Sequence, residues 1–408
     1  MNTPVSAVLS RPVAVMVFLA FAFAYFFSAL VRGSTATLSP ALTAEFGLNA
    51  RDLGLLAGGY FLGFSFTQLP LGAWLDRHGP KRVVLGFLFV AVAGCAAFAL
   101  ADSFSGLLVA RVLTGVGVSA CLMAPLTGYR RWLTPAAQMR ANSWMLMTGS
   151  LGMVASTLPV QWLLPITGWR PLFLALAVLL AVSMIIVAWK VPRWDVQPHG
   201  DAPAGYGAIW RHPYFRKMMP LGFFCYGGLL AVQTLWAVPW MVKVAGYTPL
   251  AAATGLFAVN VSMLCTFWTW GMVNPWLARR GIDADRLLTW CVPVHLLCLL
   301  GIIVAGPRAG ALALALYCVS CTVVAQAHPA VGLAFPAALA GRALSAYNLV
   351  IFVGVFAVQW GIGLSIDGFK AMGLSEPQAF RAALALLLVC CVGAYGWFLA
   401  GKPHNRDS

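Results

Sequence analysis

The stretch Gly72–Arg82, GAWLDRHGPKR, has four formally charged residues and one histidine, whereas only 9% of the whole chain is charged. Long apolar runs lie on both sides of it. Gly79 and Pro80 are turn-forming residues, so they predict a short loop. Basic residues beside apolar runs are typical of the loops of membrane proteins on the cytoplasmic side. The stretch therefore predicts a loop between two membrane-spanning helices.

The composition of the chain also indicates a membrane protein. Hydrophobic residues make up 61% of its 408 residues, and its mean hydropathy is +0.85. A soluble domain is about 45–50% apolar and about 25% charged. In a soluble protein the net charge of +15 would point to nucleic acid as a partner. Here the basic residues fall between apolar segments, so we expect a lipid bilayer and no nucleic acid as a partner.

Apolar segments long enough to span a bilayer, which takes about 20 residues, recur along the chain. We predict an all-α membrane protein with about twelve transmembrane helices in two pseudo-symmetric six-helix bundles. The Pro- and Gly-rich stretch 191–216 predicts a cytoplasmic linker between a bundle at 1–190 and one at 217–408, which ends in a short cytoplasmic tail. The expected helices are 12–33, 52–74, 82–101, 105–128, 142–164, 170–190, 217–242, 251–276, 287–305, 309–334, 344–366 and 378–400.

Lys and Arg are unevenly distributed between the expected loops. If both termini are cytoplasmic, the cytoplasmic side has 18 of these residues and the outer side has 7. The positive-inside rule then predicts cytoplasmic termini in a bacterial-type inner (plasma) membrane. No small-residue cleavage site follows the first segment, so we expect an uncleaved helix rather than a signal peptide.

The two halves of the chain resemble each other in sequence. A shift of 202 residues places LDRHG, at 75–79, on LARRG, at 277–281, each after the second helix of its half. The same shift places Arg140 on Arg342 and Gly152 on Gly354. Repeated halves are typical of secondary transporters, whose substrate site lies between them.

Two motifs resemble those of the major facilitator superfamily. GAWLDRHGPKR is similar to its signature Gly-x-x-x-Asp-Arg-x-Gly-x-Arg/Lys-Arg, between the second and third helices. RVLTGVG, at Arg111–Gly117, is similar to the Arg-x-x-x-Gly-x-Gly motif of its fourth helix. The resemblance covers essentially the whole chain. It implies a monomeric secondary transporter that works by alternating access, is not an enzyme and needs no cofactor.

The resemblance also assigns a gate. In the superfamily the acid of the first motif, here Asp76, meets the N-terminal end of the eleventh helix and helps to hold the outward-facing state. We expect Gly72 to let a neighbouring helix approach closely. The alternative is a basic loop that only sets the topology. The expected gate residues are Gly72, Asp76, Arg77, Gly79, Lys81 and Arg82, and the fourth-helix motif residues are Arg111, Gly115 and Gly117.

The stretch 25–42, YFFSALVRGSTATLSPAL, resembles the anion:cation symporter branch, in which an arginine of the first helix contacts an anionic substrate. Helical spacing puts Tyr25, Ser28 and Arg32 on one face, and a guanidinium binds a carboxylate well. The alternative for Arg32 is a positive anchor at the membrane interface. Arg111 is either functional or extends to the outer surface. The expected substrate-binding residues are Tyr25, Arg32, Arg111, Gln233, Trp236, Tyr347 and Asn348.

The sequence predicts no carboxylate in the middle of a helix, where proton-driven transporters usually carry one. His295 and His328 are alternative titratable groups. The stretch 149–159, GSLGMVASTLP, lacks the Gly-Pro-x-x-Gly-Gly pattern of drug/proton antiporters. We therefore predict a transporter of a small organic anion, with a coupling ion that the family implies is a proton. The alternative function is efflux of amphiphilic or aromatic compounds.

The ten cysteines lie mostly in apolar runs. Cys318 and Cys321 form a CxxC pair, which is a possible redox or metal motif. The sequence shows no second pair and no His/Cys cluster beside it. We therefore expect the cysteines to pack as small apolar side chains, and we predict no metal site.

Overall fold

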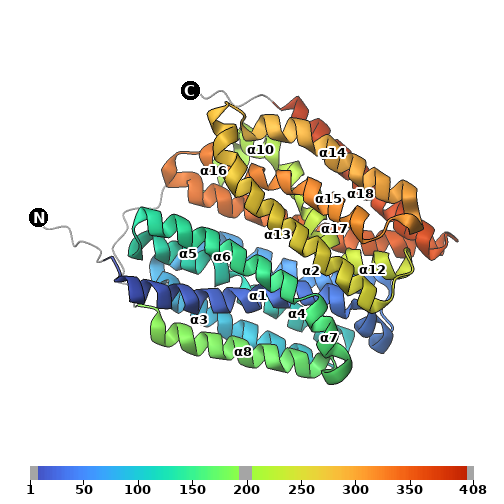
Figure 1. The fold of residues 1–408 in the computed structure, drawn as a ribbon, viewed down its shortest axis with the longest axis horizontal. Helices are drawn as coiled ribbons and strands as arrows, with labels where there is room; N and C mark the ends of the chain where they lie inside the picture. The colour runs from blue at the N-terminus through green and yellow to red at the C-terminus, as the bar shows by residue number, and fades with distance from the viewer. Residues whose placement is uncertain (1–7, 193–204, 402–408) are drawn as a thin grey trace, which may run out of the picture.

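The computed structural model describes residues 8–192 and 205–401, and every regular element in these ranges is helical (Figure 1). The first half contains α1 (Arg11–Phe46), α2 (Ala50–Phe66), α3 (Gln68–Ala99), α4 (Phe104–Val118), α5 (Ala120–Trp132), α6 (Pro135–Ala155), α7 (Leu158–Thr167) and α8 (Trp169–Lys190). The second half begins with α9 (Gly207–Arg211), α10 (Pro213–Pro220), the π-helical η1 (Leu221–Tyr226), α11 (Gly227–Ala231), the π-helical η2 (Val232–Trp236) and α12 (Ala237–Lys243). It continues with α13 (Pro249–Arg279), α14 (Ala284–Ala305), η3 (Gly306–Arg308), α15 (Ala311–Cys321), the 3₁₀-helical η4 (Thr322–Gln326), α16 (Ala327–Leu333), α17 (Ala337–Ala371) and α18 (Glu376–Ala400).

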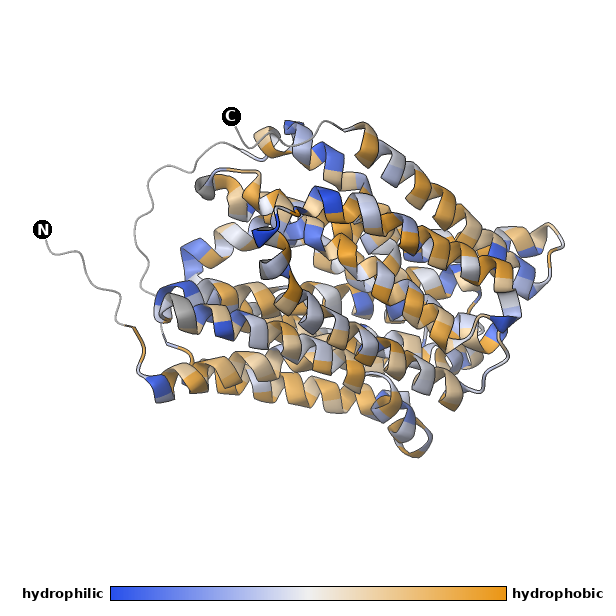
Figure 2. Cartoon of the chain, turned by 45° about the horizontal axis from the view of Figure 1, so that its top comes forward, coloured by the Kyte–Doolittle hydropathy of each residue, from blue (hydrophilic) through white to orange (hydrophobic). Residues whose placement is uncertain are grey.

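Ten helical stretches of the described chain are long and apolar enough to cross a membrane. Apolar residues run along these helices, and hydrophilic residues gather near their ends (Figure 2). The two other expected spans are helical but interrupted. The second is divided between α2 and the first part of α3, and the fifth is divided at Ser156 and Thr157. The chain is an integral, multi-pass membrane protein, which confirms the predicted all-α membrane fold.

The first helix is longer than the sequence indicated. We expected an end near residue 33, but α1 runs for 36 residues to Phe46. The polar residues after Arg32 are buried rather than exposed at an interface. Thr37 Oγ1 donates to the Ser156 carbonyl at 2.8 Å, and Ser34 and Ser39 donate to carbonyls of their own helix. Arg32 therefore lies about 20 Å inside the end of the helix, at 1.5 Å per residue.

The repeat in the sequence corresponds to a repeated contact between helices. A Cβ atom on Gly152 would lie 2.4 Å from the carbonyl oxygen of Phe26, in α1. A Cβ atom on Gly354 would lie 2.4 Å from the carbonyl oxygen of Phe223, in η1. The first and fifth helices of each half thus cross at a glycine, which allows close backbone packing.

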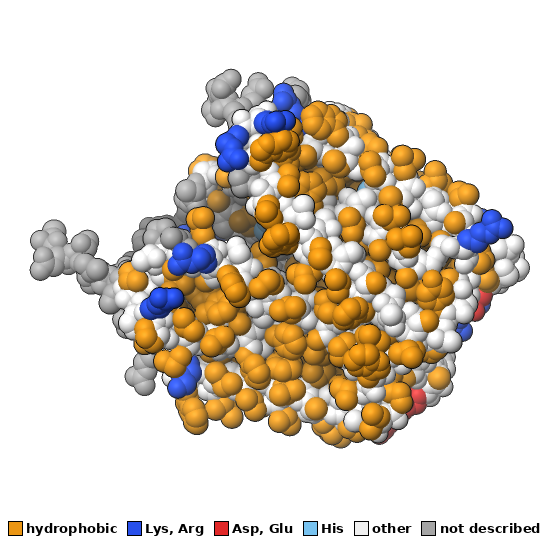
Figure 3. Space-filling model, viewed as in Figure 1, with side chains coloured by type: hydrophobic (Ala, Val, Ile, Leu, Met, Phe, Trp, Pro, Cys, Tyr) orange, Lys and Arg blue, Asp and Glu red, His pale blue; other side chains and the backbone are white. Residues whose placement is uncertain are grey.

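The helices form two groups, α1–α8 and α10–α18, which lie side by side (Figure 1). We call the end that holds Arg11 and Lys190 the terminal end, and the opposite end, which holds Phe46 and Ala371, the far end. The visible face is largely hydrophobic, and most of its Lys and Arg side chains lie toward the left, which is the terminal end (Figure 3). A membrane therefore surrounds the middle of the molecule.

The two glycines of the fourth-helix motif allow α4 to contact its neighbours closely. A Cβ atom on Gly115 would lie 1.9 Å from the carbonyl oxygen of Tyr60, and one on Gly117 would lie 2.1 Å from the backbone nitrogen of Ala91. Gly72 differs, because no atom lies within 4 Å of its Cβ position. The close approach that we expected at Gly72 is therefore not present in this structure.

We predict that Gly117→Ala destabilises the protein by about 1–3 kcal/mol, since the added methyl group overlaps with backbone atoms of α3. Gly72→Ala is the matched control and should leave stability within about 0.5 kcal/mol of the wild type. Thermal unfolding of both purified variants in detergent would test this. Equal stability of the two variants would contradict the close contact at Gly117.

Candidate substrate site

Arg32, in α1, lies within interaction range of three tyrosines that come from both halves. Its guanidinium and the Tyr25 hydroxyl lie close enough to interact. Tyr60 in α2 and Tyr226 in η1 are also within electrostatic reach of Arg32. Tyr25 is only 8% exposed and Tyr60 is 1% exposed, whereas Arg32 is partly exposed. The structure therefore brings together two of the predicted binding residues, Tyr25 and Arg32.

Arg32 forms no ion pair with any residue in the described part of the chain, 8–192 and 205–401. A guanidinium inside a membrane protein is costly without a counter-charge. Its fork of N–H donors matches the two oxygens of a carboxylate. The tyrosine hydroxyls around it can donate further hydrogen bonds to an anion. The arrangement thus offers hydrogen-bond donors of the kind that match a carboxylate.

Arg111 is a second buried base, placed behind this site. It is 1% exposed, so its side chain does not extend to the outer surface. One nitrogen donates to the Val31 carbonyl at 3.3 Å, and another donates to the Thr35 hydroxyl. The guanidinium carbon lies 5.3 Å from the centre of the Tyr60 ring, a cation–π distance. In this structure Arg111 therefore fixes the segment of α1 that carries Arg32.

Gln233 and Trp236, both predicted to bind substrate, make contacts within the second half. Gln233 Nε2 donates to Asn260 Oδ1 at 2.6 Å. The indole nitrogen of Trp236 donates to the Gln359 carbonyl at 3.1 Å, which links η2 to α17. Both side chains are nearly fully buried, at 6% and 2% exposure. In the described chain no hydrogen bond joins either side chain to Arg32, and their role in substrate binding stays a prediction.

Tyr347 and Asn348 lie closer to the terminal end. Tyr347 is 1% exposed, and its hydroxyl donates to the Met218 carbonyl at 3.2 Å. Asn348 is partly exposed and lies 3.0 Å from the ring of His328, measured between Oδ1 and Nε2. Tyr347 thus joins α17 to α10.

The predicted gate residues lie at the terminal end, where the turn has the expected form. Gly79 has φ 76° and ψ 160°, a conformation that favours glycine. Lys81 Nζ donates to the Val191 carbonyl at 2.8 Å, which ties the loop to the end of α8. Asp76, Arg77 and Arg82 are exposed. Within the described ranges, Asp76 makes no hydrogen bond or ion pair.

At the far end, the carboxylate of Asp367 joins the two halves. Asp367, near the end of α17, accepts hydrogen bonds from the backbone nitrogens of Ala50 at 3.3 Å and Arg51 at 2.7 Å. These are the first residues of α2, so the carboxylate caps the N-terminus of that helix. Nearby, a Cβ atom on Gly54 would lie 2.5 Å from the Gln359 carbonyl oxygen. The helix pair α2/α17 is thus tightly closed at the far end.

The sequence did not single out Asp367, because it placed this acid only at a helix end. Tyr60 was also missed, since an aromatic residue in an apolar run gives no signal of its own. The available clue to Tyr60 is the pair of glycines before it, Gly58 and Gly59, which let α2 pack closely against its neighbours.

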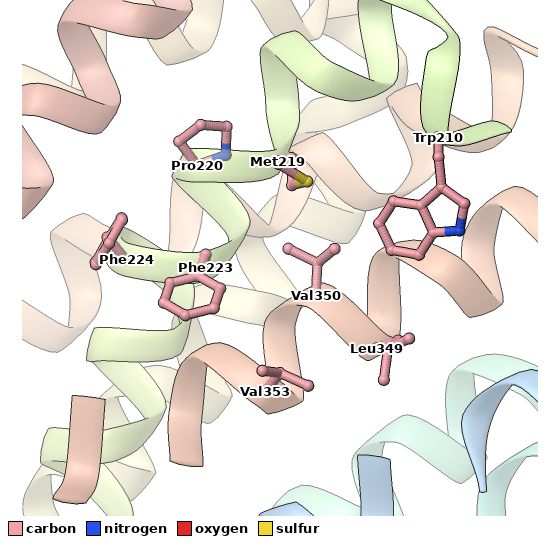
Figure 4. Close-up of a pocket in the computed structure, with 8 residues that line it drawn as sticks. All are labelled: Trp210, Met219, Pro220, Phe223, Phe224, Leu349, Val350 and Val353. Carbon is pink, nitrogen blue, oxygen red and sulfur yellow. The ribbon is translucent and has the colours of Figure 1, made fainter. Parts of the chain in front are cut away.

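A pocket of about 400 Å³ lies on the second half, beside η1 and α17 (Figure 4). Its lining is made entirely of apolar and aromatic side chains, which offer no counter-charge for an anion. The lining residues are Trp210, Met219, Pro220, Phe223, Phe224, Leu349, Val350 and Val353.

The model of the Major Facilitator Superfamily matches residues 21–359, and the chain belongs to this family. It is 26% identical to the inner membrane transport protein YajR of Escherichia coli K12, covering 82% of this chain and 73% of that protein. It is 22% identical to the "Probable L-galactonate transporter" of the same strain, covering 93% and 88% of the two chains. It is 26% identical to the 4-hydroxybenzoate transporter PcaK of Pseudomonas aeruginosa, covering 41% and 38%.

Among solved structures, a bacterial homologue of the human lysosomal transporter Spinster, in an inward-facing and unoccupied conformation, has the same fold. The TM-score is 0.76 at 17% identity, over 96% of this chain and 98% of that chain. These relatives are transporters and not enzymes. The predicted superfamily and its two-bundle fold are confirmed.

Proposed function

We propose that the protein is a secondary transporter that moves a small organic anion across the bacterial inner membrane by alternating access. The observation that carries the proposal is Arg32, a guanidinium without a carboxylate partner in the described chain, within electrostatic reach of tyrosines of both halves. A carboxylate bound there would supply the missing counter-charge. Two of the relatives are named for carboxylates, L-galactonate and 4-hydroxybenzoate, which agrees with this chemistry.

We further propose that the terminal end is cytoplasmic, on the basis of the excess of Lys and Arg there. With this orientation, the outer side is closed by the α2/α17 contact at Asp367, and the Asp76 gate on the cytoplasmic side is released. The conformation then corresponds to an inward-facing state. This orientation would put the motif loop on the cytoplasmic side, together with the predicted termini and linker, of which residues 1–7, 193–204 and 402–408 lie outside the described ranges.

The proposal is tested by uptake into proteoliposomes that contain the purified protein. The substrates should be matched pairs: a sugar acid and its neutral alcohol, and an aromatic carboxylate and its amide. We expect exchange of labelled carboxylates and no exchange of their neutral partners. Uptake driven by an imposed pH gradient and abolished by a protonophore would support a proton as the coupling ion.

The alternative, efflux of amphiphilic compounds, is favoured by one observation, the apolar pocket beside η1. The same proteoliposomes distinguish the two functions. Transport of lipophilic cations without transport of any carboxylate would contradict the anion proposal and support efflux.

A further inference from the structure

Three ligand-type side chains from three different helices meet inside the second half. Cys225 lies in η1, His295 in α14 and Cys391 in α18. The two sulfur atoms and a ring nitrogen of His295 all lie within 4.8 Å of one another. All three residues are 0% exposed. The sequence did not reveal this His/Cys cluster, because up to 166 residues separate its members.

The His295 ring packs against Tyr317 but lacks a well-formed hydrogen bond in this core. Neither ring nitrogen makes a hydrogen bond with acceptable geometry to a described residue. The Tyr317 carbonyl lies within electrostatic reach of the ring but outside that geometry. A buried polar group without a partner is costly, and an imidazole beside thiols is a common ligand set for metal ions.

Two more groups lie beside the cluster. Cys321, from the CxxC pair, donates weakly through its sulfur to the Cys225 carbonyl at 3.4 Å. The Tyr317 ring lies 4.9 Å from that of His295, and its buried hydroxyl has no hydrogen-bond partner in the described chain. Cys225 is in a π-helical turn, and α15 changes to 3₁₀ geometry directly after Cys321. Such local changes of helix type are frequent at functional sites.

We propose that Cys225, His295 and Cys391 form a binding site for a thiophilic divalent metal ion, represented by Zn²⁺, that lies outside the substrate pathway. A tetrahedral zinc site has Zn–S bonds of about 2.3 Å, so its sulfur atoms stand about 3.8 Å apart. The cluster needs to contract by at most about 1 Å to reach this geometry. Cys321 and Tyr317 lie beside the cluster, where they can support the ligands without coordinating the ion.

The charge of the site selects a divalent ion. When Zn²⁺ binds, the Cys225 and Cys391 thiols each release a proton, and His295 coordinates as the neutral imidazole. Two thiolates and one divalent ion sum to zero, which suits a site without water. A Cu⁺ ion on the same ligands would leave a net negative charge in the core. The bound ion would connect the seventh, ninth and twelfth helices of the fold.

The test uses the full-length protein, purified in detergent without a histidine tag. Zinc is supplied both during growth and after purification, and bound metal is counted by mass spectrometry. We expect about one zinc ion per wild-type protein. Replacement by Co²⁺ should give thiolate-to-metal charge-transfer absorption. The Cys225→Ser/Cys391→Ser double variant should lose both signals, and Cys390→Ser, an exposed cysteine next in sequence, should keep both.

Folding is monitored in each variant by size-exclusion chromatography. If the double variant does not fold, His295→Gln provides the second test, because it should weaken zinc binding while keeping the thiolate absorption of Co²⁺. The proposal is overturned if the wild type binds no zinc under either condition, or if a folded double variant binds as much as the wild type. Binding of Cu⁺ without Zn²⁺ would overturn the assignment of a divalent ion.

Discussion

Replacement of Arg32 by alanine is expected to reduce uptake of the organic anion by a factor of about ten to more than a hundred. A hydrogen bond to a charged group contributes about 1.5–3 kcal/mol, and each 1.4 kcal/mol is about tenfold in affinity. The loss should appear as a raised KM or as no measurable uptake. The neighbouring Tyr25 and Tyr226 cannot compensate, because their hydroxyls carry no charge.

Two further variants separate charge from geometry. Arg32→Lys keeps the positive charge but not the planar fork, so partial uptake is expected. Lys190→Ala removes an exposed base at the end of α8 and should not change uptake. Ligand binding to each variant can be measured independently by thermal shift. Unchanged uptake of every carboxylate by Arg32→Ala would refute the substrate site.

The fold could be predicted from the sequence because the bilayer imposes one simple requirement, about 20 apolar residues per helix. The same rule also led to the main error of the prediction, which is the position where the first helix ends. Residues 33–39 include the hydroxyl residues Ser34, Thr35, Thr37 and Ser39, so hydropathy ended the first helix before them. In the structure these residues belong to α1 and are buried against other helices. Hydropathy does not distinguish polar residues that face water from those that face protein. The depth of Arg32 was therefore visible only in the structure.

The residues that the sequence missed depend on contacts between distant helices. Asp367 contacts α2 across more than 300 residues, and no local pattern indicates which helix end it meets. The same holds for the proposed metal site. In the sequence, Cys225, His295 and Cys391 each look like a residue packed in its own helix. The motif residues Gly115 and Gly117 were recognisable because their spacing is fixed within one helix.

Asp76 and Asp367 lie at opposite ends of the α2/α17 side of the molecule, and we expect their amide variants to have opposite effects. Asp367→Asn removes the charge from a helix cap that is present in this conformation. It should therefore shift the population toward the state that is open at the far end. Asp76→Asn removes a gate that the family resemblance places in the opposite state, so it should shift the population the other way.

The expected size of each shift follows from the strength of such contacts. A carboxylate at a helix N-terminus contributes about 0.5–2 kcal/mol, which changes the ratio of the two states by a factor of about two to thirty. Distances between spin labels at Leu100→Cys and Met372→Cys, both exposed at the far end, would report the populations. The exposed native cysteines Cys265 and Cys390 are first replaced by serine.

Asp102→Asn is the matched control for this experiment. Asp102 is also an acid at the far end, but its partner Arg170, at 3.4 Å, belongs to the same half of the molecule. Loss of this exposed pair should change the free energies of the two states equally, so the distances between the labels should not change. A shift in the same direction by both the Asp76 and Asp367 variants would refute two opposing latches, because removal of contacts from opposite states cannot favour the same one.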